Sequence, residues 1–332
     1  MTFNLKRERM IKIDEKHYIW AEKYRPQTVE DLIIPATIKI QLQNWIKDGQ
    51  IPNLGIWGNT PGLGKTSLTN ALTKDLNASV LWKNASGEGG IDTMREEIPP
   101  FASSVSIDGR PKIVVLDEAD NLTSQQNGAQ YNLRGSIEKY AKNCRFILTG
   151  NYKEKVIKPI LNRLSNFDFD ELFIKNKKEL GAEIFKRLCW ILENEKVEYD
   201  KTDVTKVIKN FWPSIREMTM FLQKSIVDNH LVIDEKYVEV DKIKEEVMKC
   251  IKARDFKGML KAVNDMPDPS SLYTYIYKHM EEYFDYTDKS IPHMILKLSN
   301  YMDKASRARD EMVNCAAFCT DVMTDINIKF KG

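Results

Sequence analysis

The sequence predicts an α/β domain with a parallel sheet covered by helices on both faces, followed by a small helical domain and an all-helical terminal domain. Three observations support this fold class. Between residues 54 and 169, four short apolar runs alternate with stretches of helical periodicity, a pattern typical of buried parallel strands. A glycine-rich segment separates the first apolar run from the first helical stretch. Beyond residue 169 the strand signals fade and helical periodicity prevails.

The four apolar runs are predicted to be the strands of the sheet. The clearest is the β-branched run at residues 113–116, and the other three are residues 54–57, 80–83 and 145–149. Helices are expected between them, at residues 65–76, 91–103 and 125–142.

Changes in these patterns divide the chain into four parts. The first residues are polar and charged and are expected to form a loose or partner-dependent arm. The predicted parts are the arm at 1–17, the α/β domain at 18–167, the small helical domain at 168–232 and the terminal helical domain at 233–332.

The small helical domain is predicted to contain three helices. Two are residues 177–194 and 202–211. The third should open at Pro213 and run to residue 229, because proline suits the first turn of a helix. The terminal domain is expected to be helical from residue 240 onward.

Composition limits the kind of protein that this chain can be. Hydrophobic residues make up 42% and charged residues 30%, which are ordinary values for a globular protein, and the net charge of +2 gives no overall basic field. Any contact with DNA must therefore come from a local patch. The five cysteines show no paired metal-ligand spacing and are expected to be reduced. Without a signal-peptide pattern or a long apolar run, the protein is expected in the cytoplasm.

The glycine-rich segment has the pattern of a phosphate-binding loop, or P-loop. It follows a predicted strand and precedes a predicted helix, so its backbone N–H groups and the helix dipole can face phosphate. Lys65 is expected to reach the β- and γ-phosphates of ATP, and Thr66 to hold Mg²⁺. One departure is Asn59, which stands where the motif has its first glycine. The candidate nucleotide-binding residues are Asn59, Thr60, Pro61, Gly62, Leu63, Gly64, Lys65, Thr66 and Ser67.

Two carboxylates follow the strand at residues 113–116. Asp117 is placed to coordinate Mg²⁺ through water, and Glu118 to orient and partly deprotonate the water that attacks ATP. Having both groups favours hydrolysis over nucleotide binding alone. Residues 117–120 also spell the signature of DEAD-box helicases, although such enzymes need two similar ATPase cores and only one P-loop is present.

Several segments together resemble the clamp-loader ATPases related to replication factor C, which belong to the AAA+ class. The resemblance spans residues 18–225, keeps the family's order and is carried by segments at 20–26, 84–95, 133–143 and 146–152. Residues 162–164 read Asn-Arg-Leu where cellular members carry Ser-Arg-Cys. With the short terminal domain, this makes the chain most similar to the large subunits of T4-like bacteriophage clamp loaders.

The resemblance implies further nucleotide contacts. Tyr24, Arg25 and Pro26 would touch the adenine, although Tyr24 can equally be a core residue and Pro26 a stiff turn. Asn151, at the end of a predicted strand, would contact the γ-phosphate and the attacking water. Arg216 would reach ATP from the small helical domain of the same subunit.

The resemblance also implies partners. Arg163 would act in trans, as an arginine finger, on ATP held by a neighbouring subunit. Other copies of the chain and a small subunit would form a five-subunit spiral held by a collar of the terminal domains. The spiral would take a sliding clamp and the backbone of primer–template DNA, with Arg95, Arg110 and Lys112 as DNA candidates, each of which can instead be a solvated surface charge.

Three other functions fit parts of the pattern. A helicase loader or origin-recognition ATPase of the same class is the nearest alternative. A DEAD-box helicase shares the acidic box, and a scaffold subunit would bind ATP without hydrolysing it. The presence of both Asp117 and Glu118 argues against the scaffold.

Overall fold

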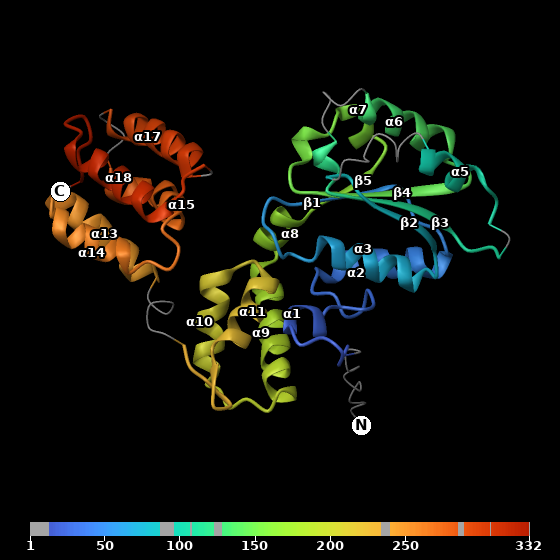
Figure 1. Cartoon of the computed structure of the whole chain (residues 1–332), viewed down its shortest axis with the longest axis horizontal. Coiled ribbons are helices and arrows are strands. Elements are labelled where there is room, and N and C mark those ends of the chain that lie inside the picture. The colour runs from blue at the N-terminus through green and yellow to red at the C-terminus, as the bar shows by residue number, and fades with distance from the viewer. Residues whose placement is uncertain are drawn as a thin grey trace. The chain divides into compact units, whose positions relative to one another are not determined.

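The computed structural model describes residues 13–86, 96–106, 108–122, 128–233, 240–284, 289–305 and 307–331. The chain forms two compact units, residues 1–232 and 233–332, and each is described by itself (Figure 1).

The first unit is built on a five-stranded sheet in the order β2-β3-β4-β1-β5, in which every pairing is parallel. The strands are β1 (Leu54–Trp57), β2 (Ser79–Asn84), β3 (Lys112–Asp117), β4 (Cys144–Gly150) and β5 (Ser165–Asp168). The four predicted strands are present. The fifth was not predicted, because its sequence Ser-Asn-Phe-Asp contains a single apolar residue and gives no apolar run.

Helices cover both faces of this sheet, as predicted. Figure 1 shows α2 (Ala36–Asp48) and α3 (Lys65–Asp75) on one side, and α5 (Ile98–Ser103), α6 (Ala129–Lys139) and α7 (Lys158–Leu161) on the other. Positions in β1 and β3 are almost all buried, because side chains pointing to either face meet a helix layer. Parts of two predicted helices, residues 91–95 and 125–127, lie outside the described residues.

Four helices follow the sheet, and with the hairpin after them they form the lid. They are α8 (Phe169–Lys175), α9 (Lys177–Asn194), α10 (Lys201–Phe211) and α11 (Ile215–Lys224). The short helix α1 (Trp20–Lys23) packs against α11, so the beginning of the described chain lies on the lid.

The predicted third helix of the lid is wrong at both ends. Ser214 caps α11 by accepting a hydrogen bond from the backbone N–H of Glu217, so Pro213 lies outside the helix. The helix ends at Lys224, and the chain then forms a hairpin of β6 (Ile226–Val227) and β7 (His230–Leu231). Asp228 and Asn229 both have positive φ, as a tight two-residue hairpin turn requires.

The second unit is helical, as expected for residues from 240 onward. Its helices are α13 (Val240–Ala253), α14 (Phe256–Asn264), α15 (Ser271–Lys278), α16 (Met280–Tyr283), α17 (Ser290–Ala305) and α18 (Glu311–Thr324). A separate apolar core that includes Met259, Tyr273 and Phe318 holds it together. All five cysteines of the chain are buried and unpaired.

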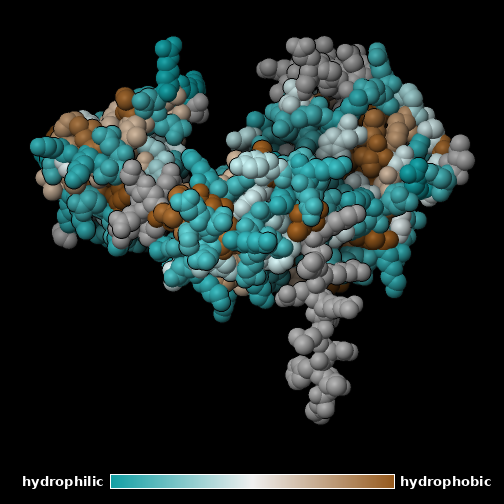
Figure 2. Space-filling view, turned by 60° about the horizontal axis from the view of Figure 1, so that its bottom comes forward, coloured by the Kyte–Doolittle hydropathy of each residue, from teal (hydrophilic) through white to brown (hydrophobic). Residues whose placement is uncertain are grey.

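None of the described helices is long and apolar enough to cross a bilayer. On the face drawn in Figure 2, apolar side chains form separate areas among hydrophilic ones.

Candidate functional site

The P-loop joins β1 to α3, as the sequence predicts. Gly62 and Gly64 have φ of 75° and 96°, in the left-handed region that glycine tolerates best, and Gly64 precedes the first residue of α3. The ammonium of Lys65 donates to the carbonyl oxygens of Gly58 at 2.5 Å and Thr60 at 3.2 Å. The loop therefore curls around its own lysine, with the N-terminus of α3 directly behind it.

The carboxyl ends of β3 and β4 lie side by side because the two strands are parallel neighbours. Asp117, the last residue of β3, accepts a hydrogen bond from the Thr149 hydroxyl of β4. Glu118 follows with φ of 56°, a conformation that costs energy for a non-glycine residue and is frequent at functional sites. The predicted pair of carboxylates is thus held at the edge of the sheet where the P-loop also begins.

A buried carboxylate that sequence reasoning missed ties these strand ends together. Asp120 is 3% exposed, and it accepts hydrogen bonds from the backbone N–H groups of Asn151 and Tyr152, both at 3.2 Å. A Cβ atom on Gly150 would stand 2.5 Å from an oxygen of Asp120, so only glycine permits this approach. The position of Asn151 after β4 is therefore fixed by the acidic segment after β3.

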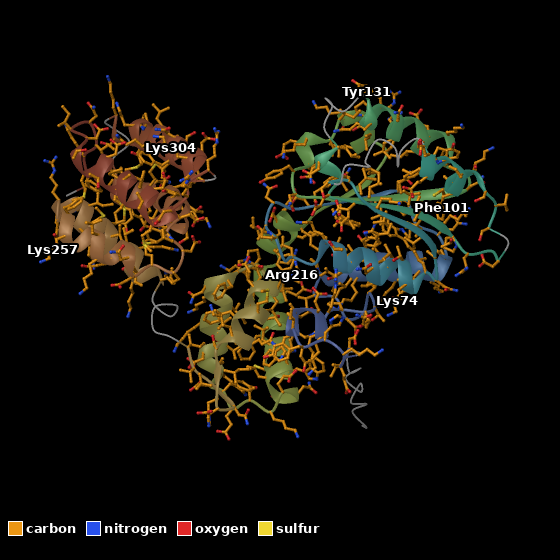
Figure 3. The ribbon with its side chains drawn as sticks, viewed as in Figure 1. Lys74, Phe101, Tyr131, Arg216, Lys257 and Lys304 are labelled. Carbon is orange, nitrogen blue, oxygen red and sulfur yellow. The ribbon has the colours of Figure 1, made fainter. Side chains whose placement is uncertain are left out.

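The lid reaches the P-loop through the first turn of α11. The backbone N–H of Arg216 is 3.4 Å from the carbonyl oxygen of Gly62. The Arg216 side chain is 59% exposed, and Figure 3 shows it where the lid meets the α/β core. The sequence therefore identified a lid arginine that the fold brings to the P-loop.

The segment before the first strand completes the site. Tyr24 is buried, and its hydroxyl donates to Glu195 of the lid at 2.6 Å; burial, and next this carboxylate, raise the pKa of Tyr24 well above its usual range. Arg25 donates from Nε to the Ser67 hydroxyl of α3 at 3.3 Å. The segment thus contacts both the lid and the helix that follows the P-loop.

These segments line one cavity. Its wall combines residues that follow Ile19, the P-loop, the beginning of α3 and three lid helices, α8, α9 and α11. The lining residues are Trp20, Ala21, Glu22, Tyr24, Arg25, Pro26, Leu32, Ile33, Ile34, Gly62, Leu63, Gly64, Lys65, Thr66, Ser67, Phe169, Arg187, Ile191, Ile215, Arg216 and Thr219. Three predicted groups that are far apart in the sequence, around Tyr24, Lys65 and Arg216, therefore meet at one hollow.

A second carboxylate that the sequence did not single out anchors the start of the P-loop. Asp170, in the first turn of α8, accepts from the backbone N–H groups of Asn59 at 2.5 Å and Thr60 at 3.3 Å. Burial lowers the pKa of Lys65, while the charges of Asp170, Asp120 and Asp117 act in the opposite direction. Asp170 belongs to no sequence motif. It reaches the P-loop because α8 directly follows strand β5, which was not predicted.

A magnesium ion at this site would depend on nucleotide for part of its coordination. In the described part of the chain, no group of three His, Cys, Asp or Glu side chains is arranged to hold a metal. The hydroxyl and carboxylate oxygens of Thr66 and Asp117 are the ligands that Mg²⁺ prefers, and phosphate oxygens commonly complete such sites. The donor set therefore fits Mg²⁺ bound together with a nucleotide.

Arg163 lies apart from the cavity. Its guanidinium pairs with Glu138 of α6 and donates to the Pro159 carbonyl. It is not among the residues that line the cavity of its own chain, an arrangement that an action in trans requires.

The three DNA candidates have different outcomes. Arg95 lies outside the described residues. Arg110 is exposed and pairs with Asp108. The prediction for Lys112 is wrong, because this residue is 8% exposed and its ammonium donates to the carbonyls of Phe101 at 2.7 Å and Ser104 at 2.8 Å. Lys112 thus holds the end of α5 against β3.

Comparisons with known proteins show the family of the chain. The family described as "ATPase family associated with various cellular activities (AAA)" matches residues 56–173, which contain the P-loop and both strand ends. Among solved structures, a RuvB mutant of Thermotoga maritima aligns with a TM-score of 0.50 and 16% identity over 69% of this chain and 79% of its own, a likeness of fold alone.

The relatives are more specific. The replication factor C small subunit of Sulfurisphaera tokodaii is 35% identical over 74% of this chain and 75% of its own. The sliding-clamp-loader large subunits of Enterobacteria phage T4 and Escherichia phage RB69 are 33% and 30% identical, each over 66% of this chain and 69% of their own. The chain therefore belongs to the clamp-loader family of AAA+ ATPases, together with the replication factor C small subunits and the phage sliding-clamp-loader large subunits.

Proposed function

We propose that this protein is an ATP-driven subunit of a sliding-clamp loader, which loads a processivity clamp onto primer–template DNA during replication. The observation that carries the proposal is the meeting of Tyr24, Lys65 and Arg216 at one cavity, in a chain of the clamp-loader family. Nucleotide bound there would contact the α/β core and the lid at once, so its binding can set their relative pose.

The residues at the strand ends have distinct roles in this proposal. Lys65 and the P-loop N–H groups bind the phosphates, and Glu118 orients the attacking water with the help of Asn151. A Mg²⁺ ion held by Thr66 and Asp117 would neutralise charge on the phosphates. Tyr24, Arg25 and Pro26, which also line the cavity, bind the base.

The second half of the proposal concerns the assembly. Each nucleotide is contacted by Arg163 of a neighbouring subunit. The guanidinium of this arginine neutralises negative charge that develops on the phosphates during hydrolysis. Copies of this chain and a small subunit form a five-membered spiral through their terminal helical units, residues 233–332. Cleavage of ATP then loosens contacts between neighbours and releases the clamp on DNA.

Turnover in the presence of both partners tests this function. We expect the ATPase rate of the assembled complex to rise when clamp and primed DNA are added together. Glu118→Gln should nearly abolish turnover while ATP still binds, because the change removes the base and keeps the shape. Glu154→Gln, an exposed carboxylate after Asn151, is the matched control and should leave the rate unchanged. A rate that ignores clamp and DNA, or an isolated subunit that works at full speed, would contradict the proposal.

A further inference from the structure

One carboxylate bridges two arginines at the wall of the cavity. Glu22, in α1, accepts a hydrogen bond from Arg25 at 3.0 Å on one oxygen and from Arg216 at 3.0 Å on the other. Arg25 belongs to the same N-terminal segment, whereas Arg216 comes from the lid, 194 residues further along the chain. Glu22 therefore links the segment to the lid at the position where nucleotide is proposed to bind.

The segment that carries Glu22 is fixed on two sides. The backbone N–H of Trp20 donates to Gln223 of α11 at 2.9 Å, and Lys23 pairs with Glu195 at 2.6 Å. Arg25 reaches Ser67 of α3. The contacts of Trp20 and Lys23 fix the backbone around Glu22 without either arginine, so the bridge to Arg216 is a separate interaction and not what holds the segment in place.

The charges around the cavity are unevenly distributed. Of the described residues that line it, Glu22 alone is acidic, whereas Arg25, Lys65, Arg187 and Arg216 are basic. Partial burial by itself raises the pKa of Glu22, but the hydrogen bonds and charges of Arg216 and Arg25 outweigh it and bring the pKa below its ordinary value. An ionised carboxylate thus stands among cations that suit phosphate.

We propose that Glu22 is a positioning residue that holds the Arg216 guanidinium at the cavity as a substitute for phosphate, so that nucleoside triphosphate must displace the carboxylate from Arg216 when it binds. This rests on the proposed nucleotide site. Two anions beside one guanidinium repel each other, so the bridge lowers the affinity for nucleotide. In return, it keeps the lid arginine ordered at the mouth of the cavity before nucleotide arrives.

A double-mutant cycle on the full chain tests the proposal. Binding of a non-hydrolysable ATP analogue is measured by calorimetry for the unmodified protein, Glu22→Gln, Arg216→Ala and the double variant. Because exposed ion pairs of this kind are weak, Glu22→Gln is expected to tighten binding by about two- to fivefold. In the Arg216→Ala background the same change should tighten binding less, because only the bridge to Arg25 is then released.

Two further variants keep the test decisive. Glu22→Asp retains the charge but shortens its reach, so it should tighten binding in the same direction and serves if Glu22→Gln does not fold. Glu195→Gln removes a carboxylate that holds the same segment through Lys23 and Tyr24 without touching either arginine. It should lower the unfolding temperature, and any change that it makes in nucleotide affinity should be the same with and without Arg216.

The outcomes separate this proposal from the site itself. Weaker binding by Glu22→Gln, or a tightening that is equally large without Arg216, overturns the role of Glu22. If the unmodified protein does not bind the analogue, or if Lys65→Ala leaves binding unchanged, the nucleotide site fails instead.

Discussion

The backbone N–H of Arg216 lies 3.4 Å from the carbonyl oxygen of Gly62, so the lid is bonded directly to the P-loop. This contact requires glycine in the loop. A Cβ atom at Gly62 would meet the Ser214 hydroxyl and would stand 2.9 Å from Cβ of Arg216. A movement of the P-loop is therefore expected to displace helix α11, which carries the lid arginine, and the reverse.

Replacing Gly62 by alanine is expected to separate the lid from the loop. The added methyl group cannot fit against Arg216, so ATPase activity should fall at least about tenfold while the α/β core stays folded. Gly109→Ala is the matched control, because Gly109 has a similar φ of 70° with open space around it. The control should lose only about 1 kcal/mol of unfolding free energy, from backbone strain, and keep its activity. Equal activities of the two variants would contradict this account.

Gln130 is expected to be critical for stability, although it belongs to no sequence motif. This residue of α6 is 2% exposed, donates to the carbonyls of Leu122 and Lys155, and accepts from the N–H of Ile157. It thereby joins the segment after β3 to the segment after β4. Gln130→Leu removes the partner of three backbone groups, one of them in a buried hydrogen bond and two in part-buried ones, and should cost about 2–4 kcal/mol in denaturant unfolding.

The control for Gln130 lies on the same helix. Tyr131 is exposed on the surface of α6, as Figure 3 shows, and Tyr131→Ala should change the unfolding free energy by less than about 0.5 kcal/mol. Turnover should fall further than nucleotide affinity in Gln130→Leu, because the displaced segments carry Glu118 and Asn151. A variant as stable as the unmodified protein would show that water replaces the lost amide.

Mixing two inactive variants tests whether Arg163 acts in trans. Arg163→Ala should reduce turnover of the assembled complex about a thousandfold, since an arginine finger contributes on that scale. Complexes that combine Arg163→Ala subunits with Glu118→Gln subunits contain some sites with both groups intact, so part of the activity should return. Arg134→Ala, which removes a second partner of Glu138, is the control and should remain active. Absence of any recovery in the mixture would place the action of Arg163 within its own chain.

The terminal unit is expected to lose stability in acid through Asp325. The N–H of Asn327 donates to this carboxylate, and Lys297 lies 3.1 Å from it; together they lower its pKa against the opposing effect of burial. A lowered folded-state pKa contributes stability that is complete above the unfolded value of about 3.9 and disappears as the pH falls through the folded value.

The measurement for Asp325 compares it with Asp325→Asn between pH 6 and pH 3. The unmodified protein should be the more stable at pH 6, and the difference should shrink below about pH 4. All six tryptophans precede residue 233, so their fluorescence follows the first unit while circular dichroism also follows the second. Parallel stability curves for the two proteins would exclude a titrating contribution from Asp325.

The sequence predicts most of the fold because buried parallel strands leave short apolar runs between stretches of helical periodicity. The strand at residues 165–168 escaped prediction, since it lies at the sheet edge and alternates polar residues with one phenylalanine. The hairpin after Lys224 escaped too, because Asp228 and Asn229 were read as part of a helix although both suit a tight turn.

The motif residues of the site could be predicted from the sequence, but the residues that hold the site segments in place could not. Lys65 and Asp117 belong to patterns of fixed spacing. Asp120, Gln130 and Asp170 act through hydrogen bonds to the backbone of segments distant in sequence, and such pairings become visible only in the folded chain. Lys112 is the opposite case. A lysine is expected at the surface, but the ammonium of this one is bound by carbonyl groups of its own domain.

The position of α1 on the lid also bears on how the chain is made. Trp20 bonds to Gln223 across 203 residues of sequence. At a synthesis rate of about 5–20 residues per second, the ribosome needs roughly 10–40 s to produce Gln223 after it has produced Trp20. During that interval the indole ring and its neighbours are without their native cover, so a nascent chain of this protein presents a natural substrate for chaperones before its first unit can close.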